Sequence, residues 1–523
     1  MSFRFDTKWG VLIVTCLAVF IMVIDTTIMN VSISALVEDL NTDLTAIQFT
    51  IAIYALIMAS FMLFGSKMQD VIGRKKTFML GVAFYGAGTF LASMSWNIKI
   101  LLIGWSILEG LGAAFMLPAT ASFLTGTYEG KDRLFAFGLW GGVGAAGAAF
   151  GPIVGGFLTT FYSWRWAFRL ELLVVITIII FSYLLIEIKP KMNFKDIDIF
   201  GTTLSFAGLS LIIIGILSIK NFNMWNIIPV LIGFGMILLG GFYLWQKKLK
   251  EENRYPLVDI DLFKNRTFSI GNIVGMIQNI VIAGVLFIIP VFLQSVTGIN
   301  AFLTGVALLP LSLSILFFSI SASKLTSITS PKNLIMAGFL IALIGTVLLR
   351  DVFSLKTVIE DLIFGSIVFG IGVGIILSQL TNLTLSSASK EQESDASGIL
   401  NTTRQLGTSI GTALIGIVLF TALFTGLISG IGSFDISGDM TSEEIAEELQ
   451  EWAYKMQETS GKNDISSSPE IEKIPDELKK DVEFIVDNAI SKAMKSSFDA
   501  IAIILSLGFF ASLFIPQKKR VKR

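Results

Sequence analysis

Three acidic side chains lie inside long apolar segments of this 523-residue chain. Asp25 lies in the segment at 10–33, Glu109 near the middle of 99–121, and Glu171 near the beginning of 166–187. A charged side chain at the centre of a bilayer costs about 2.5 kcal/mol or more, and such residues usually mark an ion or substrate pathway. Burial disfavours the ionised form of a carboxyl group, so each acid can bind a proton and release it when its surroundings change. This chemistry indicates proton-coupled transport.

Each acid also has a structural explanation. A carboxylate in an apolar helix can be retained because it is hydrogen-bonded or ion-paired. The candidate partners are Thr26 and Thr27 for Asp25, neighbouring polar groups for Glu109, and Arg165 or Arg169 for Glu171.

The composition is that of a polytopic membrane protein. Hydrophobic residues make up 53% of the chain, charged residues only 15%, and the mean hydropathy is +0.75, whereas soluble domains carry about 25% charged residues. A hydrocarbon core about 30 Å thick needs roughly 20 apolar residues per helix, and a backbone in lipid must satisfy its hydrogen bonds internally. We therefore expect an all-α integral membrane protein with 14 transmembrane helices. The predicted spans are 10–33, 46–66, 77–95, 99–121, 134–158, 166–187, 197–219, 227–246, 268–292, 302–322, 333–350, 358–384, 396–428 and 497–516.

Several classes of function are disfavoured by residues that the chain lacks. It has no histidine and only one cysteine, Cys16, so we expect no metal site and no internal disulfide, and a proton relay has to use Asp or Glu. No G-x-x-x-x-G-K-[ST] sequence is present, so ATP is not the expected energy source. The net charge of −1 gives no sign of nucleic-acid binding. We expect no cofactor and no enzymatic activity; a membrane enzyme would need a nucleophile, a metal cluster or paired acids at a membrane face.

The distribution of Lys and Arg predicts the orientation in the membrane. Alternating spans place the basic loops on one side, which the positive-inside rule assigns to the cytoplasm together with both termini. Residues 247–266 then form a cytoplasmic connector, and the acidic, Ser-rich segment 430–495 faces outside, with helical patterns beginning at Thr441 and running over 476–495. Its role stays open between a helical cap, a solvated loop and a ligand sensor. The basic loops contain Arg74, Lys75 and Lys76; Lys131 and Arg133; Lys189 and Lys191; Lys247, Lys248 and Lys250; Lys264 and Arg266; and the tail at 518–520.

Two sequence strings suggest moving parts. In the loop at 66–76, Gly73 permits a tight turn, and Asp70 and Arg74 could form a contact that opens and closes; the alternative is an ordinary basic loop. In the fifth span, Gly147, Gly151 and Gly155 recur every four residues and share one helix face, which permits close helix packing. Pro152 removes a backbone hydrogen bond beside them and favours a bend, and Gly156 extends the string.

These strings resemble the motifs of one transporter family, the major facilitator superfamily, in its fourteen-helix drug:proton antiporter branch. The string at 147–156 matches the antiporter motif Gly-x-x-x-Gly-Pro-x-x-Gly-Gly, and 66–76 and 24–31 resemble the motifs of the second loop and first helix. The chain departs from the family pattern where Ser66, Val71, Ser106, Glu109 and Glu171 replace the usual Gly, Arg, Arg, Gln and Asn. A buried cation has therefore been exchanged for additional carboxylates.

The resemblance implies two six-helix bundles that rock about a midplane substrate site. It divides the chain into an N-terminal bundle (1–190), two inserted linker helices (191–250) and a C-terminal bundle (251–523) that includes the outer segment 430–495. Further candidate site residues are Asn30 in the first-helix motif, Gln278 as a polar group in an apolar span, and Arg404, which is expected to pair with Glu393 or Asp395 as a gating contact.

The predicted function is proton-coupled export of lipophilic compounds, cationic or neutral, by alternating access. The alternative is an exporter or flippase of a native lipid or amphipathic metabolite on the same fold. The expected partners are the substrate, protons and the lipid bilayer. The expected form is a monomer in the cell membrane.

Overall fold

Every regular element in the described part of the chain is a helix. The computed structural model describes residues 7–187, 190, 193–218, 226–326, 329–389, 392–431 and 476–516. Residues 432–475 of the outer segment, with the predicted helix start at Thr441, lie outside the described residues. The main helices are α1 (Thr7–Val31), α2 (Ile33–Asp39), α3 (Leu44–Ile72), α4 (Arg74–Ser93), α5 (Ile98–Leu101), η1 (Leu102–Glu109), α6 (Gly110–Thr127), α7 (Gly130–Phe161), α8 (Arg165–Phe181), α9 (Ile199–Leu217), α10 (Ile228–Glu251), α11 (Arg266–Ser295), α12 (Ala301–Leu325), α13 (Pro331–Arg350), α14 (Ile359–Leu385), α15 (Glu393–Ile431) and α18 (Asp476–Leu513).

A helix occupies each of the fourteen predicted spans, which confirms the all-α fold class. Thirteen helices of the described ranges are long and apolar enough to cross a membrane. The remaining span is α4, which has 20 residues and begins with Arg74, Lys75 and Lys76. The predicted outer helix at 476–495 and the last span form one continuous helix of 38 residues, α18.

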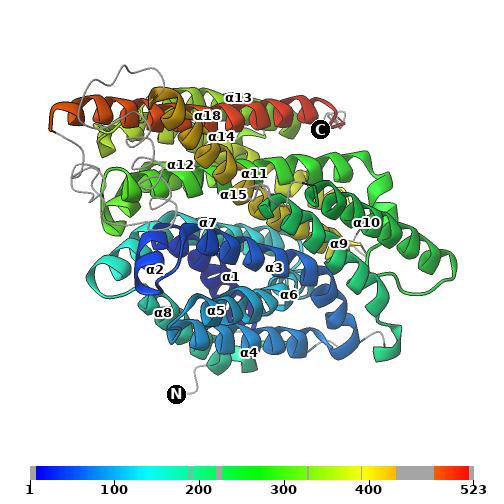
Figure 1. Cartoon of the computed structure of the whole chain (residues 1–523). Helices are drawn as coiled ribbons and strands as arrows, with labels where there is room; N and C mark the ends of the chain where they lie inside the picture. Colours follow the sequence, from blue (N-terminus) through cyan, green and yellow to red (C-terminus); the bar gives the residue numbers. More distant parts are fainter. Residues whose placement is uncertain are drawn as a thin grey trace.

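The helices form two groups with a separate pair beside them. In Figure 1 the N-terminal helices, blue to cyan, lie below the C-terminal helices, green to red, and α9 and α10 lie together at the right. Helices α1, α3, α4, α6, α7 and α8 pack on one another; α11–α15 and α18 form the second group; and α9 packs on α10 and α3. The residue boundaries between these units stay a prediction.

Two helix pairs form most of the contact between the groups. Helix α3 packs on α15, where the Ser409 hydroxyl donates to the Ala52 carbonyl and the Thr402 hydroxyl to the Ala59 carbonyl, each at 3.2 Å. Helix α7 packs on α12 through Gly156, whose Cα approaches the Ala301 backbone so closely that an added Cβ would collide with it. Movement of one group against the other therefore has to change these two contacts.

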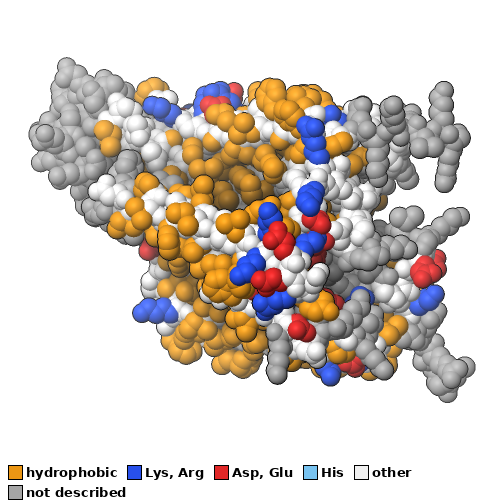
Figure 2. Space-filling view, turned by 90° about the vertical axis from the view of Figure 1, so that its right-hand side faces the viewer, with side chains coloured by type: hydrophobic (Ala, Val, Ile, Leu, Met, Phe, Trp, Pro, Cys, Tyr) orange, Lys and Arg blue, Asp and Glu red, His pale blue; other side chains and the backbone are white. Residues whose placement is uncertain are grey.

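A network of charged groups attaches the connector at 247–266 to α15 and, through Asp395, to α3. Lys67 of α3 lies 3.1 Å from Asp395 of α15, and Asp395 accepts the Asp259 amide at 3.1 Å. Lys250 binds Asp259 and Asp261 at 2.5 and 2.6 Å. The molecular face at the right of Figure 1 displays such groups: Figure 2 shows basic and acidic side chains gathered near its centre among hydrophobic ones.

The ionic contacts of the connector persist throughout the physiological pH range. Hydrogen bonds from Lys250 and Lys264 lower the pKa of Asp261 from 3.8 to about 2. Burial acts to raise the pKa of Asp259, but hydrogen bonds from Gln392 and Lys250 outweigh it and leave that pKa below its ordinary value. A lowered pKa stabilises the folded state above the unfolded pKa, and this contribution is lost only as the pH falls through the folded value.

Replacing Asp395 should loosen this network. In Asp395→Ala, the partly buried Lys67 ammonium and the Asp259 amide lose an acceptor, which should lower the free energy of unfolding by about 1–3 kcal/mol. The measurement is the thermal midpoint of the full chain in detergent. Glu251→Gln is the control, because Glu251 is 68% exposed and forms only a 3.9 Å pair with Lys247, which is worth little. Equal midpoints for the two variants would contradict the assignment.

Candidate functional site

The three acids singled out from the sequence meet at one point. Asp25 comes from α1, Glu109 from the last residue of η1, and Glu171 from α8, and all three are fully buried. One carboxylate oxygen from each lies within 4.8 Å of those from the other two. We call Asp25, Glu109 and Glu171 the carboxylate cluster. The sequence indicated each acid separately, whereas the structure brings them together inside the N-terminal group of helices.

A π-helical segment positions one side of the cluster. Residues Leu102–Glu109 form the π-helix η1 between α5 and α6. Such segments are rare and are frequent at functional sites. Here η1 directs both Trp105 and Glu109 toward α1, and the Ser106 hydroxyl fastens the segment to the Thr50 carbonyl of α3 at 2.7 Å. Ser106 thus makes a neutral contact with α3.

Aromatic side chains surround the cluster and donate to it. The Trp105 indole N–H donates to Asp25 Oδ2 at 3.0 Å, and the Tyr85 hydroxyl donates to Glu171 Oε2 at 3.1 Å. Tyr54 of α3 stacks on Trp105 with ring centroids 5.6 Å apart. Sequence reasoning missed Tyr54, Tyr85 and Trp105 as site residues. Their signal was an aromatic ring with a polar tip in the middle of an apolar span.

The donors around the cluster are too few for its oxygens. Four of the six carboxylate oxygens, Asp25 Oδ1, Glu109 Oε1 and Oε2, and Glu171 Oε1, have no hydrogen-bond partner among the described residues. Two unit charges about 4 Å apart interact with roughly 4 kcal/mol at an effective dielectric constant of 20. Three ionised carboxylates at this spacing would repel one another strongly, so the cluster has to hold protons or a cation. Interacting acids of this kind titrate as a group.

The structural partners proposed for the acids bind elsewhere. Thr26 and Thr27 donate to backbone carbonyls of α1. Arg165 pairs with Asp39 at 2.5 Å, and Arg169 lies over the Trp166 ring at 4.9 Å. The arginine partners proposed for Glu171 are therefore wrong: both side chains have other partners, and Glu171 stays buried in the interior.

Three other predicted site residues lie away from the cluster. Asn30 is half-buried on α1 five residues after Asp25, which turns it about 140° around the helix. Gln278 is buried in α11, where its amide donates to the Val373 carbonyl of α14 at 3.3 Å. Arg404 donates to the Thr381 hydroxyl at 2.5 Å. Its expected pairing with Asp395 is wrong, because Asp395 binds Lys67; the pairing with Glu393 stays a prediction, because that side chain lies outside the described residues.

The loop motif forms the turn that its sequence predicts. Gly73 has φ +94° and joins the end of α3 to the beginning of α4, a backbone conformation that favours glycine. Arg74 donates to the Ser122 carbonyl of α6 at 2.7 Å. Asp70 lies half-buried in the last turn of α3. The roles of these residues in gating stay a prediction.

The glycine string of α7 connects the cluster helix to the other group. Gly147 and Gly151 lie against α1 beside Thr27, and a Cβ added at Gly155 would lie 2.7 Å from the Cα of Ile28. Pro152 and Gly156 lie on the side toward α12, where they face Gly305 and Ala301. Helix α7 is thus wedged between the helix that carries Asp25 and a helix of the C-terminal group.

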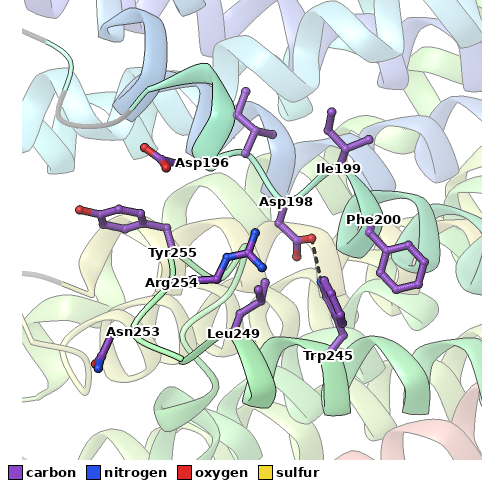
Figure 3. A pocket seen from close by; sticks show the side chains of 10 residues that line it. Asp196, Asp198, Ile199, Phe200, Trp245, Leu249, Asn253, Arg254 and Tyr255 are labelled. Atoms are coloured by element: carbon purple, nitrogen blue, oxygen red, sulfur yellow. Dashed lines mark hydrogen bonds between the residues drawn. The ribbon is translucent and has the colours of Figure 1, made fainter. Parts of the chain in front are cut away.

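A cavity of about 320 Å³ lies elsewhere, between the beginning of α9 and the end of α10. Figure 3 shows the indole N–H of Trp245 bound to Asp198, with Phe200, Arg254 and Tyr255 around the opening. The residues that line it include none of the predicted site residues. This cavity belongs to the junction of the inserted helices with the connector.

Comparison with known proteins finds a matching family and related transporters. The model of the Major Facilitator Superfamily matches residues 15–412. The riboflavin transporter RibZ of Clostridioides difficile is 27% identical over 78% of this chain and 87% of its own. The methylenomycin A resistance protein of Bacillus subtilis is 25% identical over 79% and 88%, and the multidrug transporter protein MdtP of that species is 26% identical over 77% and 73%.

Solved structures share the fold. A bacterial homologue of the human lysosomal transporter Spinster, crystallised in an inward-facing and unoccupied conformation, superposes with a TM-score of 0.64 at 14% identity and covers 98% of each chain. The human organic anion transporter MFSD10 superposes with a TM-score of 0.59 at 10% identity, over 97% of this chain and 99% of its own. At these identities the likeness establishes the fold alone.

Proposed function

This chain belongs to the Major Facilitator Superfamily, and we propose that it is a proton-coupled exporter of lipophilic compounds, cationic or neutral, in the cell membrane. Membership confirms the prediction of a transporter rather than an enzyme. The names of the curated relatives, which include drug-resistance and multidrug transporters, support a drug as the substrate. The observation that carries the coupling is the carboxylate cluster, with its three buried acids within 4.8 Å of one another.

The cluster has the chemistry of a proton carrier. It holds three acids that cannot all be ionised at low energetic cost. Its hydrogen-bond donors in the described structure are Trp105 and Tyr85, neither of which is basic. Loss of a proton raises its negative charge inside an apolar bundle, and a cationic substrate or a movement toward water then becomes favourable. At a membrane potential of 100 mV, entry of one proton supplies about 2.3 kcal/mol.

Helices beside the cluster can transmit its charge state. Tyr54 faces Asp25 from α3, and the same helix binds α15 through the carbonyls of Ala52 and Ala59. Asp25 lies on α1, which packs on α7, and α7 packs on α12. These two contacts between the helix groups are therefore one helix away from the cluster. We propose that proton binding and release bias these contacts between two arrangements, which gives alternating access.

Transport into vesicles tests this function. Full-length protein in proteoliposomes should accumulate a lipophilic cation such as tetraphenylphosphonium when an imposed pH gradient drives protons the other way, and a protonophore should abolish the accumulation. Both termini should face the side from which substrate is taken. Accumulation that ignores the pH gradient would contradict proton coupling. Movement of labelled phospholipid without movement of any drug probe would favour the lipid alternative.

A further inference from the structure

We infer that the carboxylate cluster is also a binding site for a dehydrated monovalent cation, with Na⁺ as the ion that fits. The inference concerns the site of the proposed function and rests on that function for any role in transport. Binding itself can be measured without transport.

The spacing of the oxygens suits a single ion. Oxygen ligands lie 2.3–2.6 Å from Ca²⁺, and Na⁺, whose radius is nearly the same, takes similar distances. Two oxygens bound to one such ion are then separated by at most about 4.6–5.2 Å. The three carboxylate oxygens of the cluster lie within 4.8 Å of one another, so one ion can contact all three acids with little movement of the helices.

Hydrogen bonds occupy only two of the six carboxylate oxygens of the cluster. Asp25 Oδ2 and Glu171 Oε2 accept hydrogen bonds from Trp105 and Tyr85, which fix those two carboxylates. The four other carboxylate oxygens lack a donor in the described structure. Each acid therefore offers at least one oxygen that is not already bound to a proton donor.

Tyr54 provides independent support from outside the acidic residues. Its side chain is buried, with 2% of its surface exposed, and its hydroxyl makes no hydrogen bond of normal geometry in the described structure. The hydroxyl nevertheless faces Asp25 and lies close enough to Glu109 and Glu171 to interact with their charges. The stacked Trp105 ring holds it in this direction. A buried hydroxyl without a partner is costly, and an ion in the cluster would give it one.

The number of ligands and the burial select the ion. The four carboxylate oxygens without a donor and the Tyr54 hydroxyl offer at most five oxygen ligands, fewer than the 6–8 that Ca²⁺ takes. Mg²⁺ retains several waters, which the fully buried cluster does not favour. The Born cost of dehydration rises with the square of the charge, so a divalent ion costs about four times as much to bury as a monovalent one. K⁺ is larger and would force the acids apart.

The groups that would compete with the ion for protons come from five elements. The titratable side chains that face the site are Asp25 of α1, Tyr54 of α3, Tyr85 of α4, Glu109 of η1 and Glu171 of α8. Since a cation and protons stabilise the same carboxylates, Na⁺ should bind more tightly as the proton concentration falls.

Binding of radioactive sodium to the purified full-length protein tests the inference. Scintillation proximity with ²²Na⁺ at pH 8.5, at constant ionic strength set by choline chloride, should show saturable binding of one ion per chain. Glu109→Gln should abolish it. Tyr54→Phe keeps the stacked ring and removes only the hydroxyl, and should weaken Na⁺ binding by roughly tenfold. Glu251→Gln, an exposed acid on α10, should bind as the wild type does.

The outcomes separate this inference from the proposed function. Absence of saturable ²²Na⁺ binding, or binding that Glu109→Gln leaves unchanged in correctly folded protein, would overturn the sodium site, and drug transport driven by a pH gradient would still stand. Displacement of ²²Na⁺ by micromolar Ca²⁺ or Mn²⁺ would overturn the choice of a monovalent ion. Sodium binding in a protein that transports no drug would instead overturn the proposed function.

Discussion

Glu109→Gln should abolish the accumulation of drug that is driven by a pH gradient. It should leave the exchange of drug across the same membrane unchanged. The amide keeps the size of the side chain but cannot carry a proton, so the cluster loses part of its charge change between the two states. Exchange of labelled for unlabelled drug needs only the alternating movement. Both assays are measured in proteoliposomes. We expect accumulation to fall by roughly 100-fold or more, which corresponds to a loss of about 2.7 kcal/mol of driving free energy.

Three further variants test whether the effect is specific to the carboxylate cluster. Asp25→Asn and Glu171→Gln remove the other two acids of the cluster and should give the same division between the assays. Glu251→Gln removes an exposed acid of the same kind and should leave both assays unchanged. Full accumulation in Glu109→Gln would contradict a coupling role for that residue, and loss of exchange as well as accumulation would indicate a structural role.

Gly155→Val should destabilise the protein strongly. A Cβ at residue 155 would lie 2.7 Å from the Ile28 Cα and within 3.0 Å of its side chain, so α1 and α7 have to separate. Overpacking of this kind costs typically about 1–3 kcal/mol, and more where backbone must move. We expect a lower thermal midpoint and loss of transport, because the displaced helix carries Asp25.

Gly141→Val is the matched control on the same helix. A Cβ added at Gly141 meets no atom within 4 Å in the described structure. The two substitutions make the same chemical change in α7, so the difference between their midpoints measures the close packing alone. Equal midpoints would show that α1 and α7 do not need this contact.

The sequence was sufficient for the helices because their signal is local. Length and hydropathy indicate each span in the sequence, and the structure places a helix in all fourteen. Even the amphipathic pattern at 476–495 is helical, although its continuity with the last span, in α18, was not foreseen. The turn at Gly73 was also predicted, since a positive φ has a recognisable residue preference.

The site could be predicted only in part because it depends on how helices face one another. Asp25, Glu109 and Glu171 were recognisable as costly residues, but their meeting requires particular rotations of α1, η1 and α8. The π-helix η1 changes the rotation of Glu109 and has no Pro or unusual spacing to reveal it. The expected pairing of Arg404 with Asp395 was wrong for a similar reason: Lys67, more than 300 residues away in the sequence, reaches Asp395.

Proton release from the purified protein tests the central claim most directly. Tetraphenylphosphonium is added to wild-type protein in detergent and weak buffer, and the pH is followed with an indicator dye. We predict a release of protons that saturates with drug concentration and disappears in Glu109→Gln and Asp25→Asn but persists in Glu251→Gln. If Glu109→Gln and Asp25→Asn released as many protons as the wild type, the assignment of the coupling site to the carboxylate cluster would be contradicted.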